Sequence, residues 1–226
     1  MQIPLTKRAA AEALATGFLV ATVVGSGIMA ERLAGGNVAI ALLANTLATG
    51  AALVALILNF GPISGAHMNP VVTLAVAMES GQPWSDVPAY ATAQITGGIV
   101  GTAAAHAMFG MPLFSLSTHA RHGNAQVFSE FVATFGMISV IWGCSRSRSS
   151  AVPFAVGAYI TAAYWFTAST SFANPAVAIA RCLTNTFSGI RPGDVPAFIA
   201  AEIAGAVAAT LFYRWLLPNS LVVEES

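Results

Sequence analysis

Long apolar windows separated by short polar segments dominate the pattern of this chain. Six of these windows carry almost no charged residue, and each is close to the roughly 20 residues that an α-helix needs to cross a bilayer. They predict six membrane-spanning helices. No small-residue cleavage pattern follows the first window, so we interpret it as a retained span and not as a signal peptide. The predicted spans are Ala9–Ala30, Val38–Phe60, Val87–Phe109, Val127–Cys144, Ala151–Ser169 and Val195–Leu217.

Two further apolar stretches are too short to cross a bilayer. The first runs from Val71 and stops at Glu79, and the second runs from Ala176 and stops at Arg181. An Asn-Pro pair precedes each of them. The pattern predicts two half-helices that enter the membrane partway. Two surface turns are the alternative, which the repetition in matching contexts disfavours.

Each half-helix is expected to begin at its asparagine, Asn69 or Asn174. Asn is a favoured N-cap, and Pro suits the first helical position because its missing N–H is not needed there. If both helices begin near the middle of the membrane, each directs the positive end of its dipole and unpaired N–H groups toward that level. This arrangement attracts lone pairs and repels cations.

The composition is that of an integral membrane protein. Charged residues make up 8% of the 226 residues, hydrophobic residues make up 56%, and the mean hydropathy is +0.73. The net charge is zero and no basic tract occurs, so we expect no nucleic-acid partner. The two cysteines, Cys144 and Cys182, lack metal-ligand spacing and are interpreted as small buried residues. We expect no metal and no cofactor.

The distribution of basic residues gives a weak orientation signal. An even number of spans puts both termini on one side, and the side with more Lys and Arg faces the cytoplasm. We predict a multi-pass protein of the inner (plasma) membrane with both termini cytoplasmic. The cytoplasmic side would hold Lys7, Arg8, Arg146, Arg148 and Arg214, and the outer side would hold Arg32, Arg121, Arg181 and Arg191.

A short motif occurs twice, at the start of the third and of the sixth span. The segment 86–90, followed by Gln94, reappears as 194–198, followed by Glu202. Because each half contains three spans, an odd number, the second copy must lie upside down relative to the first. We predict a single channel domain, 1–226, built from inverted repeats at about 7–110 and 125–218, with a site at their interface.

The loops before the half-helices, 64–68 and 169–173, are too polar for lipid contact. Non-helical backbone at membrane depth is tolerated only where it is buried in protein or lines a wet cavity. Glu12 and Glu130 occupy matching positions in the first and fourth spans, where they are well placed to accept hydrogen bonds from the N–H groups of these loops. We interpret both carboxylates as loop anchors. Proton carriage is the rival interpretation.

The motif set resembles the major intrinsic protein family, the aquaporins and aquaglyceroporins, from Glu12 to Arg214. The resemblance implies an all-α membrane protein of six transmembrane helices plus two re-entrant half-helices in an inverted repeat, the aquaporin fold. It also implies a homotetramer in the lipid bilayer, with one pore in each subunit and passive conduction of small neutral solutes. The residues that carry it are the box Asn69, Pro70 and Val71, the box Asn174, Pro175 and Ala176, the lead-in 64–68, and the repeated Glu with Gln94 and Glu202.

The two asparagines are expected to interrupt a chain of waters in the pore. An N-cap Asn uses its amide oxygen on its own helix, which leaves its NH2 group free to donate into the pore. A water that spends its lone pairs on Asn69 and Asn174 cannot accept a proton from its neighbour.

The predicted selectivity filter departs from the family pattern. Family members usually place Arg directly after the second box and an aromatic residue on the second span, where this chain has Val177 and Thr49. Ser171 fills the loop position. Either Ala162 or Tyr164 faces the constriction from the fifth span, and the spacing favours Tyr164. This set predicts a wider and less polar filter without arginine.

Charged residues near the outer mouth have two interpretations each. Arg181 lies one helical turn beyond Val177, so it lines the outer vestibule or anchors the loop through backbone carbonyls. His119, Arg121 and His122 follow the third span, where they either decorate the outer mouth or form a solvated loop, and we favour the solvated loop. His67 is interpreted as a loop anchor.

The substrate prediction rests on resemblance to bacterial members associated with arsenic resistance. It is a facilitator for arsenite and related metalloid hydroxides, with glycerol, urea and water also admitted. A general water and glycerol facilitator is the alternative. A coupled secondary transporter would need an ion site or a titrating carboxylate at the midplane, where this chain has Asn and Pro. An enzyme is disfavoured because no catalytic constellation lies beside the half-helices.

Overall fold

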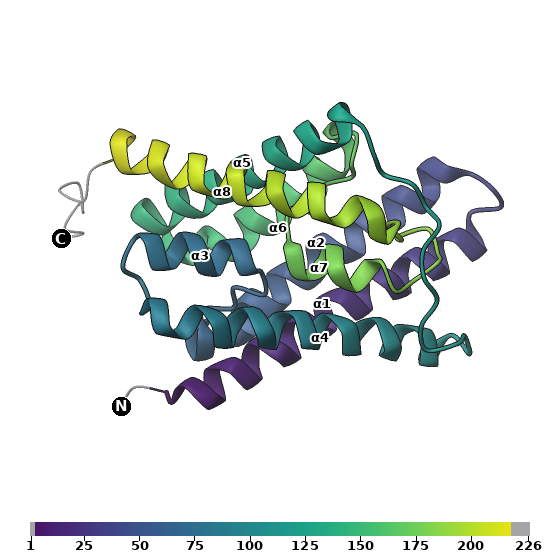
Figure 1. The fold of residues 1–226 in the computed structure, drawn as a ribbon, viewed down its shortest axis with the longest axis horizontal. Coiled ribbons are helices and arrows are strands. Elements are labelled where there is room, and N and C mark those ends of the chain that lie inside the picture. The colour runs from purple at the N-terminus through teal and green to yellow at the C-terminus, as the bar shows by residue number, and fades with distance from the viewer. Residues whose placement is uncertain (1–2, 218–226) are drawn as a thin grey trace.

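Helices form the regular elements of residues 3–217, the part of the chain that the computed structural model describes. Eight α-helices are joined by loops and by three short 3-10 turns, and Figure 1 labels the helices. The helices are α1 (Leu5–Leu33), α2 (Val38–Ser64), α3 (Pro70–Met78), α4 (Val87–Met108), α5 (Asn124–Ser147), α6 (Val152–Phe166), α7 (Pro175–Arg181) and α8 (Val195–Leu216), and the turns are Trp84–Asp86, Ser149–Ala151 and Pro192–Asp194.

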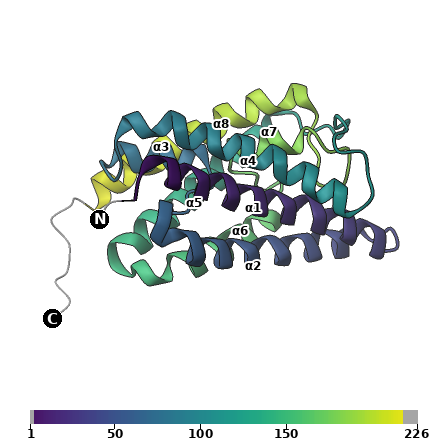
Figure 2. The ribbon, with the colours of Figure 1, turned by 90° about the horizontal axis from the view of Figure 1, so that it is seen from below.

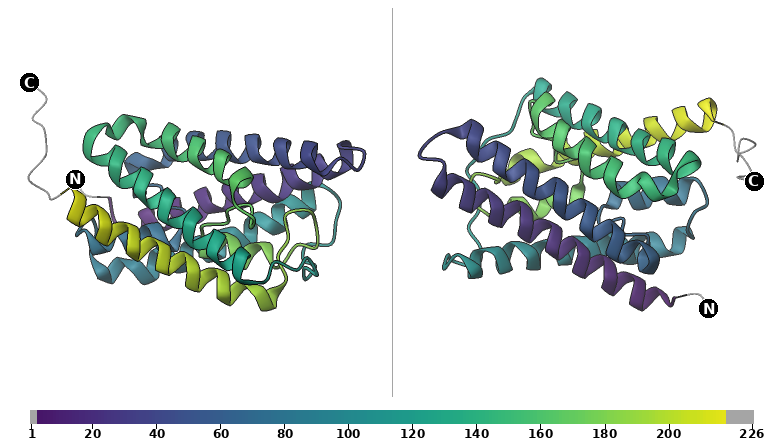
Figure 3. Two further views of the ribbon diagram at one scale, coloured as in Figure 1. Left: turned by 90° about the horizontal axis from the view of Figure 1, so that it is seen from above. Right: turned by 180° about the vertical axis from the view of Figure 1, so that it is seen from behind.

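The half-helices lie between the long helices. Figure 1 shows α3 toward the end of the bundle at which α1 begins and α8 finishes, whereas α7 lies toward the opposite end. α1 packs along α2 and α4, as seen from below in Figure 2, and α5 packs along α6 and α8. The connection 109–123 between α4 and α5 crosses the bundle near the C-terminal end of α7, which Figure 3 shows from two further sides. The order α1 to α4 is thus repeated as α5 to α8.

The long helices differ in length from the predicted spans. α1 and α2 are longer than expected, at 29 and 27 residues. By contrast, α6 has 15 residues and ends at Phe166, three residues before the predicted limit of Ser169. It ends because Thr167 leaves the helical conformation for an extended one and leads into the loop before α7. By length and composition alone, four helices of the described residues are candidates to cross a membrane, namely Leu5–Leu33, Val38–Ser64, Asn124–Ser147 and Pro192–Leu216.

Glycines set the close approach between α1 and α4. A Cβ atom at Gly97 would lie 2.1 Å from the carbonyl oxygen of Ala13, and one at Gly101 would lie 2.2 Å from that of Gly17. Gly205 of α8 plays the same part in the second half, because a Cβ atom there would lie 2.6 Å from the carbonyl oxygen of Phe131 in α5. In lipid there is no hydrophobic driving force between helices, so they associate through close packing, and small residues let their backbones approach closely.

Candidate pore and selectivity filter

Each half-helix begins at its Asn-Pro pair. The side-chain oxygen of Asn69 accepts a hydrogen bond from the N–H of Val71 at 3.0 Å. The side-chain oxygen of Asn174 accepts from the N–H groups of Ala176 at 3.0 Å and Val177 at 3.3 Å. Both prolines take the first helical position, where no donor is needed. Local capping chemistry therefore sets where α3 and α7 start.

The two asparagines also join the halves across the interior. Asn69 Nδ2 donates to the carbonyl oxygen of Ala173 at 2.7 Å, and Asn174 Nδ2 donates to that of Met68 at 2.8 Å. An amide nitrogen carries two hydrogens, so one remains on each side chain for a solute. The NH2 groups are therefore half engaged, and not wholly free as the sequence analysis expects. This reciprocal bonding holds the starts of α3 and α7 side by side.

Buried carboxylates hold the two loops. Glu12 accepts hydrogen bonds from the N–H groups of His67 at 2.9 Å and Met68 at 2.6 Å, and Glu130 accepts from those of Phe172 at 2.9 Å and Ala173 at 2.6 Å. Both glutamates are fully buried. The N–H groups of non-helical backbone thus find acceptors inside the protein, which is necessary because the hydrocarbon core of a bilayer offers none.

The loops contain non-glycine residues in the left-handed region of backbone space. A residue of this kind costs of order 1–3 kcal/mol and persists only where surrounding contacts fix it. The carboxylate bonds to adjacent N–H groups provide that fixing. The φ values are 48° at Ala66, 50° at Met68, 62° at Thr170, 51° at Ser171 and 49° at Ala173.

A cavity of about 220 Å³ runs past both asparagines. It is lined by Thr49, Tyr164, Ser171, Val177 and Arg181 together with side chains that are mostly apolar. The predicted filter residues are thus brought to one cavity from four separate segments of the chain.

Several neighbours of these residues face elsewhere. Ala162, the alternative to Tyr164, is exposed and does not line the cavity. Val71 of the first box is buried away from the cavity, and Val72 lines it instead. Pro70, Pro175 and Ala176 lie in the half-helix starts, where they shape the backbone without forming the wall.

The polar side chains of the predicted filter comprise one hydrogen-bonded pair and one atom without a partner among the described residues. Thr49 Oγ1 donates to the carbonyl oxygen of Asn45 at 2.8 Å, so the Tyr164 hydroxyl, 3.3 Å away, is the donor to Thr49. Ser171 Oγ is buried without a hydrogen-bond partner among the described residues. Val177 adds only apolar surface. The arrangement offers a solute the hydroxyl oxygens of Thr49, Tyr164 and Ser171 together with the apolar surface of Val177.

Arg181 combines the two roles that the sequence left open. Its Nε donates to the carbonyl oxygen of Ser188, which anchors the following loop. Its guanidinium carbon lies 3.5 Å from the centre of the Phe172 ring, and the residue lines the cavity while only 2% exposed. The Nη1 atom has no partner among the described residues.

Arg121 differs from the sequence prediction of a solvated loop. It is buried, with Nε donating to the carbonyl oxygen of Gly189 at 2.9 Å and Nη1 to that of Ser169 at 3.0 Å. Its backbone N–H donates to Asp194, which ties the connection 109–123 to the start of α8. Burial lowers the pKa of the Arg121 guanidinium. Desolvation and the positive charges of Arg121 and Arg181 also lower the pKa of His119.

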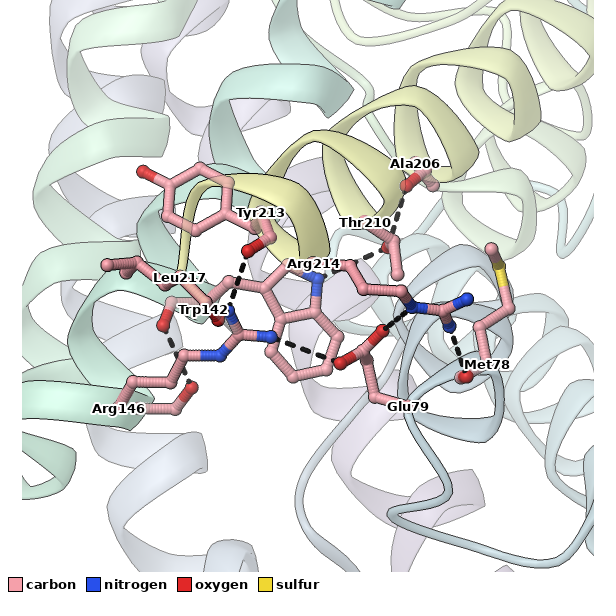
Figure 4. A network of polar contacts seen from close by, with 10 residues as sticks. Met78, Glu79, Trp142, Arg146, Ala206, Thr210, Tyr213, Arg214 and Leu217 are labelled. Atoms are coloured by element: carbon pink, nitrogen blue, oxygen red, sulfur yellow. Dashed lines mark hydrogen bonds and ion pairs between the residues drawn. The ribbon is translucent and has the colours of Figure 1, made fainter. Parts of the chain in front are cut away.

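A polar network lies beside the C-terminal end of α3, at the end of the cavity opposite Arg181. Trp142 lines the cavity there, and its indole N–H donates to Thr210 at 3.2 Å. Glu79 accepts from Arg146 of α5 at 3.1 Å and from Arg214 of α8 at 2.9 Å, as Figure 4 shows. The Arg146 guanidinium lies 5.8 Å from the Trp142 ring. Sequence reasoning missed this network, although Glu79 directly after an apolar half-helix was a signal.

Comparisons with known proteins agree with this architecture. A model of the family described as major intrinsic protein matches residues 1–168. The aquaglyceroporin AqpS of Rhizobium meliloti (strain 1021) is 57% identical over 216 residues, which cover 96% of this chain and 92% of that protein. The probable aquaporin NIP7-1 of Arabidopsis thaliana is 30% identical over 211 residues, which cover 90% of this chain and 74% of that protein.

A solved structure supports the fold. The X-ray structure of the aquaglyceroporin from Plasmodium falciparum is similar with a TM-score of 0.75 and 19% sequence identity, over 93% of this chain and 96% of that chain. The family match, the full-length relative and the paired half-helices lead to one conclusion. The chain belongs to the major intrinsic protein family, whose members are membrane channels for small neutral solutes and not enzymes.

Proposed function

We propose that this channel passes small neutral polyhydroxyl solutes, and specifically metalloid hydroxides such as arsenite together with glycerol. The filter position after the second box is held by Val177 and the second-span position by Thr49, so these two positions contribute neither a charged fork nor an aromatic ring to the passage. A hydroxyl-rich solute finds oxygen partners in Thr49 and Ser171 and an apolar wall in Val177. Undissociated arsenite carries three hydroxyl groups on one arsenic atom, and glycerol carries three on a short carbon chain.

The single observation that carries this proposal is the cavity that passes both half-helix starts and contacts all four filter side chains. Asn69 and Asn174 each retain one amide hydrogen for a passing hydroxyl. The name of the 57% identical relative, an aquaglyceroporin, favours a polyol pathway over a water-only one. A general water and glycerol facilitator without arsenite flux is the second candidate, which the same relative's name also supports.

The wider setting belongs to the same proposal. We propose inverted repeats at about 7–110 and 125–218, because α1 to α4 and α5 to α8 share their order and their carboxylate-held loops. We further propose a homotetramer in the inner (plasma) membrane with cytoplasmic termini. The support is the family for the assembly and the weak excess of basic residues on one side for the orientation.

Stopped-flow light scattering on proteoliposomes tests the substrate. Water, glycerol and arsenite gradients are compared in one preparation against empty liposomes. We expect all three fluxes to exceed the empty control and to rise linearly with the gradient. Arsenite uptake equal to the control, with glycerol flux intact, would leave the second candidate. Saturating, ion-dependent flux would indicate a coupled transporter instead.

A further inference from the structure

The helical geometry of α7 brings Arg181 back toward the filter. Arg181 follows Val177 by four residues, so both lie on one face of the helix about 6 Å apart along its axis. Side chains of a helix lean toward its N-terminus, which directs the long arm of Arg181 toward the level of Val177. Its guanidinium lies against the ring of Phe172, the neighbour of Ser171 in the loop. The charge therefore sits beside the filter although the filter position itself is apolar.

Two buried polar atoms at this level have no partner among the described residues. They are Arg181 Nη1 and Ser171 Oγ, and both residues line the cavity. Leaving a buried donor unpaired is costly, and more so when the group is charged. An oxygen atom of a solute in the cavity would satisfy the guanidinium donor, and a second hydroxyl would satisfy the serine. Each of these two residues therefore has hydrogen-bonding capacity left for a solute in the cavity.

We propose that Arg181 supplies the positive charge and the hydrogen-bond donor of this filter, from one helical turn beyond Val177. The inference rests on the proposed channel function. The Arg181 guanidinium donates to a hydroxyl oxygen of a neutral polyhydroxyl solute, while its charge repels hydronium and metal cations at the same point. The filter position itself keeps the uncharged, apolar side chain of Val177.

Arg121 is the natural comparison for this role. It also faces Phe172, with its guanidinium carbon 5.1 Å from the ring centre. Its Nε and Nη1 groups, however, donate to the carbonyl oxygens of Gly189 and Ser169, and the residue does not line the cavity. A substitution at Arg121 therefore reports on loop anchoring, whereas one at Arg181 reports on anchoring and filter together.

The test measures potassium and proton leak and glycerol flux in proteoliposomes containing the full chain. In Arg181→Met we expect the cation leak to rise at least about tenfold, because a unit charge beside a narrow, low-dielectric path is removed. In Arg181→Lys we expect native cation exclusion with glycerol flux lowered by roughly threefold or more, because the charge is kept and one hydrogen bond to the solute is lost. Arg121→Lys, the matched control, is expected to change neither reading once folded.

A double variant separates the filter role from loop anchoring. Val177→Arg combined with Arg181→Met returns a charge to the filter but does not restore the bond to Ser188. We expect it to regain native cation exclusion. A double variant as leaky as Arg181→Met would overturn the proposal, as would native leak and native glycerol flux in both single variants. If Arg181→Met fails to fold, unchanged glycerol flux in folded Arg181→Lys overturns the donor role. A native channel without glycerol flux would refute the proposed substrate class, while the leak readings still test Arg181.

Discussion

Placing an arginine at Val177 gives two guanidinium groups on one face of α7. Val177 and Arg181 are separated by four residues, about 6 Å along the helix. At that distance and an effective dielectric constant of about 20, two like charges repel by about 3 kcal/mol. Val177 is 5% exposed and lines the cavity, so the new side chain is largely desolvated and extends into the passage. We expect Val177→Arg both to lower the stability of the folded channel and to narrow the passage.

Solute size decides which flux falls. A polyol must pass the added side chain with its hydroxyl groups desolvated, whereas water passes as single molecules. Stopped-flow measurements on Val177→Arg should therefore show glycerol flux reduced at least about tenfold, a barrier increase of roughly 1.4 kcal/mol, with water flux within about twofold of native. Val177→Leu is the matched control, because it adds apolar bulk without charge and should leave both fluxes close to native. Equal loss of both fluxes in Val177→Arg would refute the filter argument.

Three further changes test the frame around the cavity. Glu130→Gln replaces one of the two acceptor oxygens by an NH2 donor that faces the N–H of a loop residue. It should lower the free energy of unfolding by about 1–3 kcal/mol, measured by thermal unfolding in detergent. An unchanged unfolding midpoint would contradict the anchoring role. Glu79→Ala should cost about 2 kcal/mol, mostly through Arg146 because Arg214 is half exposed, and should quench or shift the fluorescence of Trp142. Glu202→Gln keeps an acceptor for the Asn174 N–H. Because Glu202 Oε2 has no partner among the described residues, this change should leave the free energy of unfolding unchanged or raise it by up to about 1 kcal/mol. A fall in the unfolding midpoint would show that the carboxyl group is required.

Local chemistry explains which parts of the fold follow from the sequence. Asn69 and Asn174 start α3 and α7 because capping by a side-chain oxygen and a proline in the first turn depend only on neighbouring residues. Six apolar windows indicate the six longer helices, although by length and composition alone only four helices of the described residues qualify as membrane spans. The exact ends of these helices are harder to predict from the sequence. The end of α6, for example, is fixed by a loop that is hydrogen-bonded to Glu130, a residue far away in the sequence.

Contacts between distant segments explain what the sequence did not reveal. The bonds from each asparagine to the opposite loop join residues more than 100 positions apart, and no periodic pattern encodes them. The burial of Arg121 likewise depends on the carbonyl oxygens of two other loops. A charged residue in a polar connection is usually solvated, so the residue type gave no indication of this exception.

The ends of the two half-helices show how matching positions acquire different roles. Glu79 directly follows α3, and two arginines from α5 and α8 pair with it, so its charge is neutralised at one mouth and ties helices together. Arg181 ends α7, and no carboxylate pairs with it among the described residues, while one of its donors stays unused beside the cavity. The paired charge of Glu79 holds α3, α5 and α8 together. A buried charge without a counterion, such as that of Arg181, keeps its electric field in the cavity and acts on solutes there. The two ends of the cavity therefore differ electrostatically, and in our proposal solutes meet the unpaired charge at the α7 end.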